Sequence, residues 1–287
     1  MNAGLIDVIA GSVSFSQVDA NQSFTNDGVL HVAASQSLTI DHGTFTNFDA
    51  DTLTGGTYRI AGTFRFTDAN VSVNAAAIEL DGSAAAIDNQ ANANALANLA
   101  VNLGDLSLQN HTLRVSDFTN DGTVEIGPGA VLSLSGAYNQ EDGATFLADG
   151  STLTAPGGVI LAGGILSGTG TINGDVTNSA SITVGNDNLA GILTINGNYT
   201  QTGNGNLTIK IGGPSAGSDY DQLVVNGTAT LDGTLTVTLV NGFIPTSGHP
   251  FTVLTFESFD GAFATLAGDG GLFTPNYNPN DLTLIAN

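Results

Sequence analysis

Residues 118–136 read FTNDGTVEIGPGAVLSLSG, and the pattern in this stretch decides the fold. An apolar or aromatic residue and a Thr-Asn pair are followed by a turn and then by two short segments in which apolar and polar residues alternate. The same order of features returns in residues 24–40, FTNDGVLHVAASQSLTI, and in residues 176–203, VTNSASITVGNDNLAGILTINGNYTQTG. Imperfect repetition of a strand-turn unit on this scale is typical of stacked β folds. We therefore expect an all-β chain.

Short glycine-separated strands favour a particular kind of stack. Residues 157–174, GGVILAGGILSGTGTING, contain three apolar runs that lie too close together for conventional long hairpins. Such spacing fits the coils of a right-handed parallel β-helix, a solenoid, which we expect to span most of the chain. Asn-Gly pairs, which tolerate the positive φ that tight corners require, occur at 173–174, 196–197, 226–227 and 241–242. The same pairs also form hairpin turns, so an antiparallel β array is the structural alternative.

The pattern divides the chain into a repeat body, residues 1–242, and a C-terminal region, residues 243–287. Residues 84–103, AAAIDNQANANALANLAVNL, interrupt the strand rhythm within the body. Either a short helix or an irregular coil fits them, and in the coil Leu96, Leu99 and Val101 would still point inward. The C-terminal region is rich in aromatic residues and proline, and we expect it to form a cap or the last coils of the solenoid.

Composition narrows the function classes. Only 10% of the 287 residues are charged, and 4 Lys and Arg against 26 Asp and Glu give a net charge of −22. Nucleic-acid binding requires clustered cations, so this balance argues against a nucleic-acid partner. The chain has no cysteine and no run of about 18 apolar residues, so neither disulfides nor a membrane-spanning helix is expected.

Residues from about Gly157 to Phe263 resemble the passenger regions of bacterial autotransporters and related exported β-repeat proteins. The stretches that carry this resemblance are GGILSGTGTINGDVTNSASITVG (163–185), GILTINGNYTQTGNGNLTIKIGG (191–213), DYDQLVVNGTATLDGTLTVTL (219–239) and FTVLTFESFDGAF (251–263). The resemblance implies a right-handed parallel β-helix in a bacterial protein that is secreted or displayed on the cell surface. Such passengers include adhesins, enzymes and structural fibres, so it leaves the activity open.

The acidic residues and histidines are the candidates for a catalytic role. Asp49 with Asp51, and Asp219 with Asp221, are i, i+2 pairs that would share one face of a strand and could act together on a polysaccharide. Aspartate is also a turn residue, and we favour that interpretation for both pairs. The four histidines, His31, His42, His111 and His249, are scattered and belong to no nucleophilic motif. We therefore expect no catalytic residues, with a polysaccharide-active enzyme as the alternative.

Calcium is the one cofactor that the sequence raises. Residues 212–221, GGPSAGSDYD, are similar to a glycine- and aspartate-rich calcium-binding repeat, with Asp219 and Asp221 as the metal ligands. The segment occurs once, whereas such sites are built from tandem copies.

Asn26, Asn120 and Asn178 occupy equivalent places in the repeat. In a parallel stack, side chains at equivalent places approach each other at the strand spacing of about 4.8 Å, so their amides can hydrogen-bond along the stack. We expect these three residues to form an internal structural ladder.

These observations together predict a non-enzymatic exported protein of the cell surface or extracellular matrix: an adhesin, a stalk or a fibre segment. Its expected partners are other surface proteins, glycans or copies of itself. A glycan-binding module would present exposed tyrosines, such as Tyr58 or Tyr138, on an outer face. Strand-prone residues near both ends, 5–9 and 282–285, favour end-to-end pairing of copies into filaments.

Overall fold

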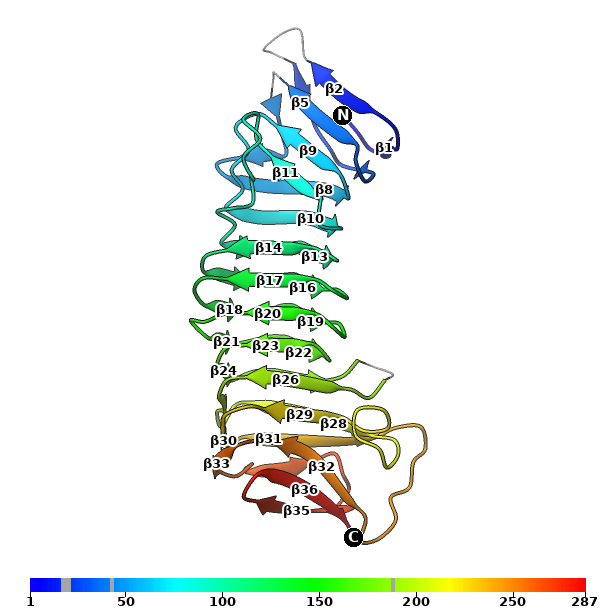
Figure 1. Ribbon diagram of the computed structural model, residues 1–287, viewed down its shortest axis with the longest axis vertical. Helices are drawn as coiled ribbons and strands as arrows, with labels where there is room; N and C mark the ends of the chain where they lie inside the picture. The colour runs from blue at the N-terminus through cyan, green and yellow to red at the C-terminus, as the bar shows by residue number, and fades with distance from the viewer. Residues whose placement is uncertain (17–21, 42–43, 187–188) are drawn as a thin grey trace. The chain divides into compact units, whose positions relative to one another are not determined.

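The computed structural model describes residues 1–16, 22–41, 44–186 and 189–287, which form two compact units, Met1–Ser135 and Gly136–Asn287. Within these ranges the chain consists of short strands joined by turns, with no helix (Figure 1). His42, one of the four histidines considered above, lies outside the described residues.

Unit 1 is built from parallel strand ladders, apart from the antiparallel pair β7–β8. Strand β1 pairs with β4, β4 with β8, β8 with β10 and β10 with β13, while β2, β5, β9 and β11 form a second parallel ladder. The strands of this unit are β1 (Leu5–Val8), β2 (Ser12–Ser16), β3 (Ser23–Phe24), β4 (Val29–Val32), β5 (Ser37–Asp41), β6 (Thr44–Phe45), β7 (Phe48–Asp49), β8 (Thr52–Ile60), β9 (Thr63–Phe66), β10 (Val73–Asp81), β11 (Ala86–Asp88), β12 (Val101–Asn102), β13 (Asp105–Gln109), β14 (Thr112–Val115), β15 (Phe118–Asn120), β16 (Thr123–Ile126) and β17 (Val131–Leu134).

Unit 2 has three ladders, to each of which every coil contributes one strand. The first ladder runs from β18 through β21, β24, β27 and β30 to β33, and the second from β19 through β22, β25, β28 and β31 to β34. The third runs from β20 through β23, β26, β29 and β32 to β36 and β35. All pairs are parallel except the last two of the third ladder.

The strand bounds of unit 2 show how short most of its strands are. They are β18 (Tyr138–Gln140), β19 (Ala144–Leu147), β20 (Thr152–Thr154), β21 (Val159–Leu161), β22 (Ile165–Gly168), β23 (Thr171–Asn173), β24 (Val176–Asn178), β25 (Ser181–Val184), β26 (Ile192–Asn196), β27 (Tyr199–Gln201), β28 (Asn206–Ile211), β29 (Gln222–Val225), β30 (Thr228–Leu231), β31 (Thr234–Leu239), β32 (Pro250–Thr255), β33 (Ser258–Gly261), β34 (Thr265–Ala267), β35 (Phe273–Asn278) and β36 (Asp281–Ala286).

Alternation within each strand builds the core. In β25, Ile182 and Val184 are fully buried while Ser181 and Thr183 are half-buried on the outer face. Because successive side chains of a strand point to opposite faces, a four-residue strand such as β25 adds two apolar side chains to the interior. Each such side chain stabilises the fold by about 1.5–3 kcal/mol through burial. The core therefore runs as a continuous apolar column through the coils of each unit.

Glycine sits where successive coils approach most closely. A Cβ atom at Gly122 would overlap the carbonyl oxygen of Gly104, its counterpart in the preceding coil. Only a residue without a Cβ allows the two backbones to approach to this distance. The glycine of the repeated Asp-Gly pair is therefore required for the close stacking of neighbouring coils.

The predicted parallel β-solenoid is confirmed, and the antiparallel array is wrong: the strands on either side of the Asn-Gly pair at 196–197, β26 and β27, belong to two different parallel ladders. Residues 84–103 contain strands β11 and β12 joined by turns, not a helix. As the coil interpretation predicted, Leu96 and Leu99 are buried; Val101 is only half-buried, because Asn102 takes the inward position.

The last strands of the chain differ from the earlier ones in how they pair. Strands β32, β33 and β34 continue the three parallel ladders, and β36 and β35 then close the third ladder with antiparallel pairs.

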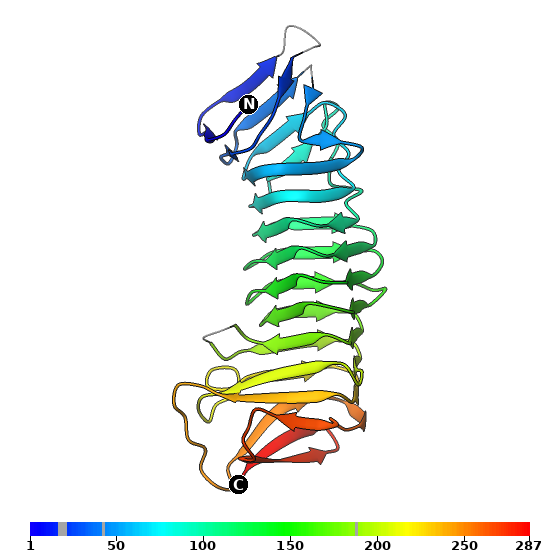
Figure 2. The ribbon, with the colours of Figure 1, turned by 180° about the vertical axis from the view of Figure 1, so that it is seen from behind.

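Three long connections leave the regular coils of unit 2. They are the β25–β26 connection, of which Gly185, Asn186 and Leu189–Gly191 are described; the β28–β29 connection, residues 212–221; and the β31–β32 connection, residues 240–249. Figure 2 shows all three on the same side of the unit, in green, yellow and orange. Because these connections differ in length, the number of residues per coil varies. Asn173 and Asn196, at equivalent places in successive coils, are 23 residues apart, whereas Asn196 and Asn226 are 30 apart.

Candidate functional site

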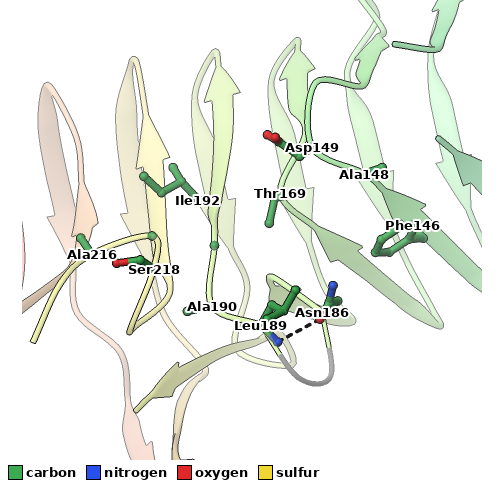
Figure 3. Close-up of a pocket in the computed structure, with 12 residues that line it drawn as sticks. Phe146, Ala148, Asp149, Thr169, Asn186, Leu189, Ala190, Ile192, Ala216 and Ser218 are labelled. Carbon is green, nitrogen blue, oxygen red and sulfur yellow. Dashed lines mark hydrogen bonds between the residues drawn. The ribbon is translucent and has the colours of Figure 1, made fainter. Parts of the chain in front are cut away.

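A cavity of about 590 Å³ lies beside the first two long connections of unit 2. Its wall includes Phe146 from β19 and Ile192 from β26, and its rim includes Leu189 from the β25–β26 connection and Ser218 from the β28–β29 connection (Figure 3). Its volume falls in the range of about 300–1,000 Å³ that is usual for small-molecule sites. Because four separate segments contribute, the cavity exists only once the coils have stacked.

Apolar side chains that the core does not use line this cavity. Phe146 is half-buried at an outward position of its strand, and Leu189 and Ile192 are 66% and 37% exposed. An outward phenylalanine is unusual here, because its register partner in the next coil, Ser167, is polar. The apolar groups are therefore available to a ligand.

Polar groups alternate with these apolar groups. Asp149 is exposed two residues after the end of β19, Thr169 follows β22, and Asn186 and Ser218 come from the two connections. The Asn186 Oδ1 atom accepts a hydrogen bond from the backbone N–H of Leu189 at 3.0 Å. The cavity thus offers one carboxylate, two hydroxyls and one amide.

A buried ion pair supports the base of the β25–β26 connection. Lys210 Nζ lies 2.8 Å from Asp221 Oδ2 and donates to the Val184 carbonyl oxygen at 2.5 Å. Asp221 is fully buried; its Oδ1 accepts from the Gly191 N–H at 3.0 Å and its Oδ2 from the Lys210 N–H at 2.7 Å. Val184 precedes the connection and Gly191 ends it, so this pair fixes both ends of the connection.

Burial has a clear electrostatic consequence at this pair. Loss of hydration raises the pKa of the Asp221 carboxyl, and the hydrogen bond and charge of Lys210 oppose that shift without cancelling it. The pair is therefore not a strong net source of stability, although removal of either partner alone would leave a polar group buried without its counterpart.

Lys210 also lines a second cavity of about 370 Å³, whose wall includes Asp219 and Val240. The two cavities share Leu189, Ala190 and Ser218. The Lys210 side chain is buried and already paired with Asp221, so little positive charge is available to a ligand in the second cavity.

The calcium prediction placed Asp219 and Asp221 together as ligands, and the structure separates their roles. Asp221 is neutralised by Lys210, and Asp219 Oδ2 accepts from the Ser215 N–H at 3.1 Å within its own loop. Across the described ranges, no group of three or more His, Asp or Glu side chains is arranged to hold a metal ion. Calcium needs six to eight oxygen ligands, so this pair fits the ion poorly and calcium binding stays a prediction.

The other acidic pair is a turn. Asp49 ends β7, and Ala50 and Asp51 follow with φ values of 45° and 60° before β8 begins. Both carboxylates are exposed and do not project together from one strand face. Of the histidines, His31 Nδ1 contacts Asp7 Oδ1 at 2.6 Å and His111 Nδ1 contacts the Gly82 carbonyl oxygen at 3.0 Å, so both join neighbouring coils.

The three predicted ladder asparagines are fully buried, and each contacts an amide of another coil. Asn2 Nδ2 donates to Asn26 Oδ1 at 2.8 Å, and Asn102 Nδ2 donates to Asn120 Oδ1 at 2.8 Å. Asn178 Nδ2 donates to Gln201 Oε1 at 3.4 Å. Further members, which the repeated motif did not reveal, join these contacts: Asn74 Nδ2 donates to Asn102 Oδ1 at 2.8 Å.

The expectation of exposed tyrosines at a glycan-binding face is wrong for both residues named. Tyr58 and Tyr138 are fully buried, because each occupies an inward position of its strand. Burial raises the pKa of the Tyr58 phenol. The Tyr138 hydroxyl lies 2.5 Å from Thr145 Oγ1, inside the core.

Sequence reasoning missed Phe146, Asp149, Thr169 and the role of Lys210. One signal was present: Lys210 is the single cation of residues 136–287 and stands at an outward position in the alternating strand β28. It is nevertheless only 7% exposed, because the β28–β29 connection folds over it. No local pattern predicts that covering.

Comparison with models of known protein families finds no match to this chain, and comparison with curated proteins finds no significant relative. The described parts of the chain contain no helix of the length and apolar character needed to cross a membrane.

Proposed function

We propose that this chain is a non-enzymatic exported protein of the bacterial cell surface or extracellular matrix, acting as an adhesin, a stalk or a fibre segment. The observation that carries this proposal is the regular parallel stack with its buried amide contacts. Within each unit such a stack presents outer faces made largely of Ser, Thr and Asn, on which partners can bind. The resemblance of residues 157–263 to autotransporter passengers supports the same class.

The positions of the aspartate pairs favour a binding protein over a polysaccharide-cleaving enzyme. Glycoside hydrolysis needs two carboxyl groups facing one substrate, and both acidic pairs are better explained by local structure. Asp49 and Asp51 form a turn, and Asp221 is buried against Lys210. A polysaccharide-active enzyme is the second candidate, because the cavity beside Asp149 is large enough for a sugar.

Surface location can be tested with the native protein on intact cells. Protease treatment of intact cells of the source bacterium should digest the protein, whereas an internal cytoplasmic control should survive. Detection of the protein only after cell lysis would contradict the proposal.

The enzymatic alternative needs a separate assay. Purified protein should release no reducing ends or unsaturated products from a panel of neutral and acidic polysaccharides. Turnover that disappears in Asp149→Asn would replace the proposed function by the enzymatic one.

End-to-end association is part of this proposal. Two inward side chains of the first coil, Ile6 and Phe15, are half-buried, whereas their register partners Leu30 and Ile40 are buried. Apolar side chains at an incompletely covered coil favour stacking of another copy against it. The net charge of −22 opposes this stacking at low salt.

Light scattering across a salt series tests this part. The mean mass should rise with ionic strength, and Ile6→Asp with Phe15→Ser should keep the protein monomeric. A wild-type mass that stays monomeric at all salt concentrations would refute self-association and leave the surface role intact.

A further inference from the structure

We infer that the 590 Å³ cavity of unit 2 binds a short neutral oligosaccharide, with Phe146 and Leu189 against the sugar rings and Asp149, Thr169 and Ser218 on its hydroxyls. As the recognition site of an adhesive surface protein, this inference rests on the proposed function and gives it a ligand class.

The chemistry of the lining selects a sugar. A pyranose has apolar C–H faces and a rim of hydroxyls that both donate and accept hydrogen bonds. Apolar surface comes from Phe146, Leu189 and Ile192, and aromatic rings supply large contact area at low entropic cost. Asp149 accepts hydrogen bonds only, whereas Thr169 and Ser218 both donate and accept.

Charge excludes the other common ligands of surface proteins. Among the described residues that line the cavity there is no lysine, arginine or histidine, so acidic glycans and phosphorylated ligands find no counter-charge. The net charge of −22 repels them further. A basic peptide would need several acids around the cavity, and of its described lining only Asp149 is acidic. The ligand should therefore be neutral, and a glycan is the neutral ligand whose apolar faces and hydroxyls match this lining.

The site is held in shape before a ligand arrives. The Lys210–Asp221 pair fixes both ends of the β25–β26 connection, which carries Leu189 and Asn186. Phe146, Thr169 and Ile192 belong to paired coils of the solenoid. A preformed site loses less conformational entropy on binding, which favours measurable affinity for a small neutral ligand.

The experiment measures binding of defined trisaccharides to the full chain by saturation-transfer NMR and isothermal titration calorimetry. Probes are maltotriose, cellotriose, xylotriose and tri-N-acetylchitotriose, with trigalacturonic acid as the acidic probe and trilysine as the basic one. Variants inside the cavity are Phe146→Ala, Thr169→Val and Asp149→Asn. Matched controls are Ile160→Ala, which removes an apolar side chain that is 44% exposed, Thr177→Val, which removes an outward hydroxyl on β24, and Asp142→Asn at an exposed acid.

Saturable binding of at least one neutral trisaccharide supports the inference if each cavity variant weakens it by about tenfold or more, and each control by less than about twofold. Circular dichroism should show all six variants folded, since every substituted side chain is at least partly exposed.

Binding of none of the neutral probes, tight binding of trigalacturonic acid or trilysine alone, or equal losses in cavity and control variants would overturn it. The proposed function fails separately: protease-accessible protein on intact cells without glycan binding would remove only this site. Glycan binding by a protein found only inside cells would remove the surface role.

Discussion

The Lys210–Asp221 pair makes the sharpest quantitative prediction about this chain. The perturbations are Lys210→Met, Asp221→Asn and the double variant. Asp221→Asn leaves the lysine ammonium buried with the Val184 carbonyl oxygen as its remaining partner. Removing one member of a buried pair destabilises by about 3–5 kcal/mol, because the other charge stays without compensation. We expect that range for Asp221→Asn.

The other two variants follow from the remaining hydrogen bonds. In Lys210→Met the carboxylate keeps the N–H groups of Gly191 and Lys210's own backbone position, at 3.0 and 2.7 Å, so we expect a smaller loss of about 2–3 kcal/mol. In the double variant no charge remains, and the asparagine Oδ1 can still accept from one of these N–H groups. We therefore expect a loss of only about 1–2 kcal/mol, the cost of one unsatisfied donor.

Hydrogen exchange is the suitable assay, because a stacked repeat opens coil by coil and one global free energy would hide a local change. Protection of the Gly191 amide should fall most in Asp221→Asn and recover in the double variant. The two single losses should exceed the double loss by several kcal/mol, a coupling that only direct partners show. Additive losses, or single losses under about 0.5 kcal/mol, would refute the reasoning.

Three further predictions concern pH, the internal amides and the glycines. Without the lysine, the raised pKa of Asp221 makes the folded state bind a proton that the unfolded state releases. The stability of Lys210→Met should therefore fall as pH rises from the ordinary carboxyl pKa through the raised one. Urea midpoints across a pH series measure this, and a stability that rises with pH would contradict it. Asn102→Leu should lower the free energy of unfolding in urea by about 2–4 kcal/mol, because Asn74 and Asn120 lose a buried partner. Asn196→Leu breaks an equivalent contact that is exposed, and it should change that free energy by less than about 0.5 kcal/mol. Equal effects of the two variants would contradict the stabilising role of the buried contacts. Gly122→Ala should lower the melting temperature, because the new Cβ atom would overlap the Gly104 carbonyl oxygen. Gly4→Ala should leave the melting temperature unchanged, because a Cβ atom at Gly4 meets no other atom. An unchanged melting temperature in both variants would contradict the close stacking of coils.

Local pattern favoured the fold class that the structure shows, although the Asn-Gly pairs left an antiparallel array open. Alternating runs such as Leu207-Thr208-Ile209 predict strands with one inward face, and their short length together with the glycines favours coils over hairpins. The repeated Thr-Asn-Asp-Gly phrase placed Asn26 and Asn120 at equivalent inward positions. These features are visible in sequence because a solenoid is stabilised by near-neighbour contacts that recur at each coil.

The alternation of apolar and polar residues did not predict which face of its strand each tyrosine occupies. Tyr58 and Tyr138 were expected outside, yet the register of their strands points both side chains into the core. A one-residue change of register reverses the face of every side chain, and short strands bounded by glycine do not specify that register locally.

The amino-acid sequence by itself therefore determined an all-β chain of short alternating strands with little positive charge, and it favoured a parallel stack with asparagines at equivalent places. Only the tertiary structure decided that Lys210 is buried against Asp221, and that Phe146, Asp149, Thr169 and Leu189 surround one cavity. The reason is physical: strand alternation and corner glycines act over a few residues. The cavity, in contrast, depends on two irregular connections folding over the outer face of the stack, and its residues lie up to about 70 positions apart in the chain.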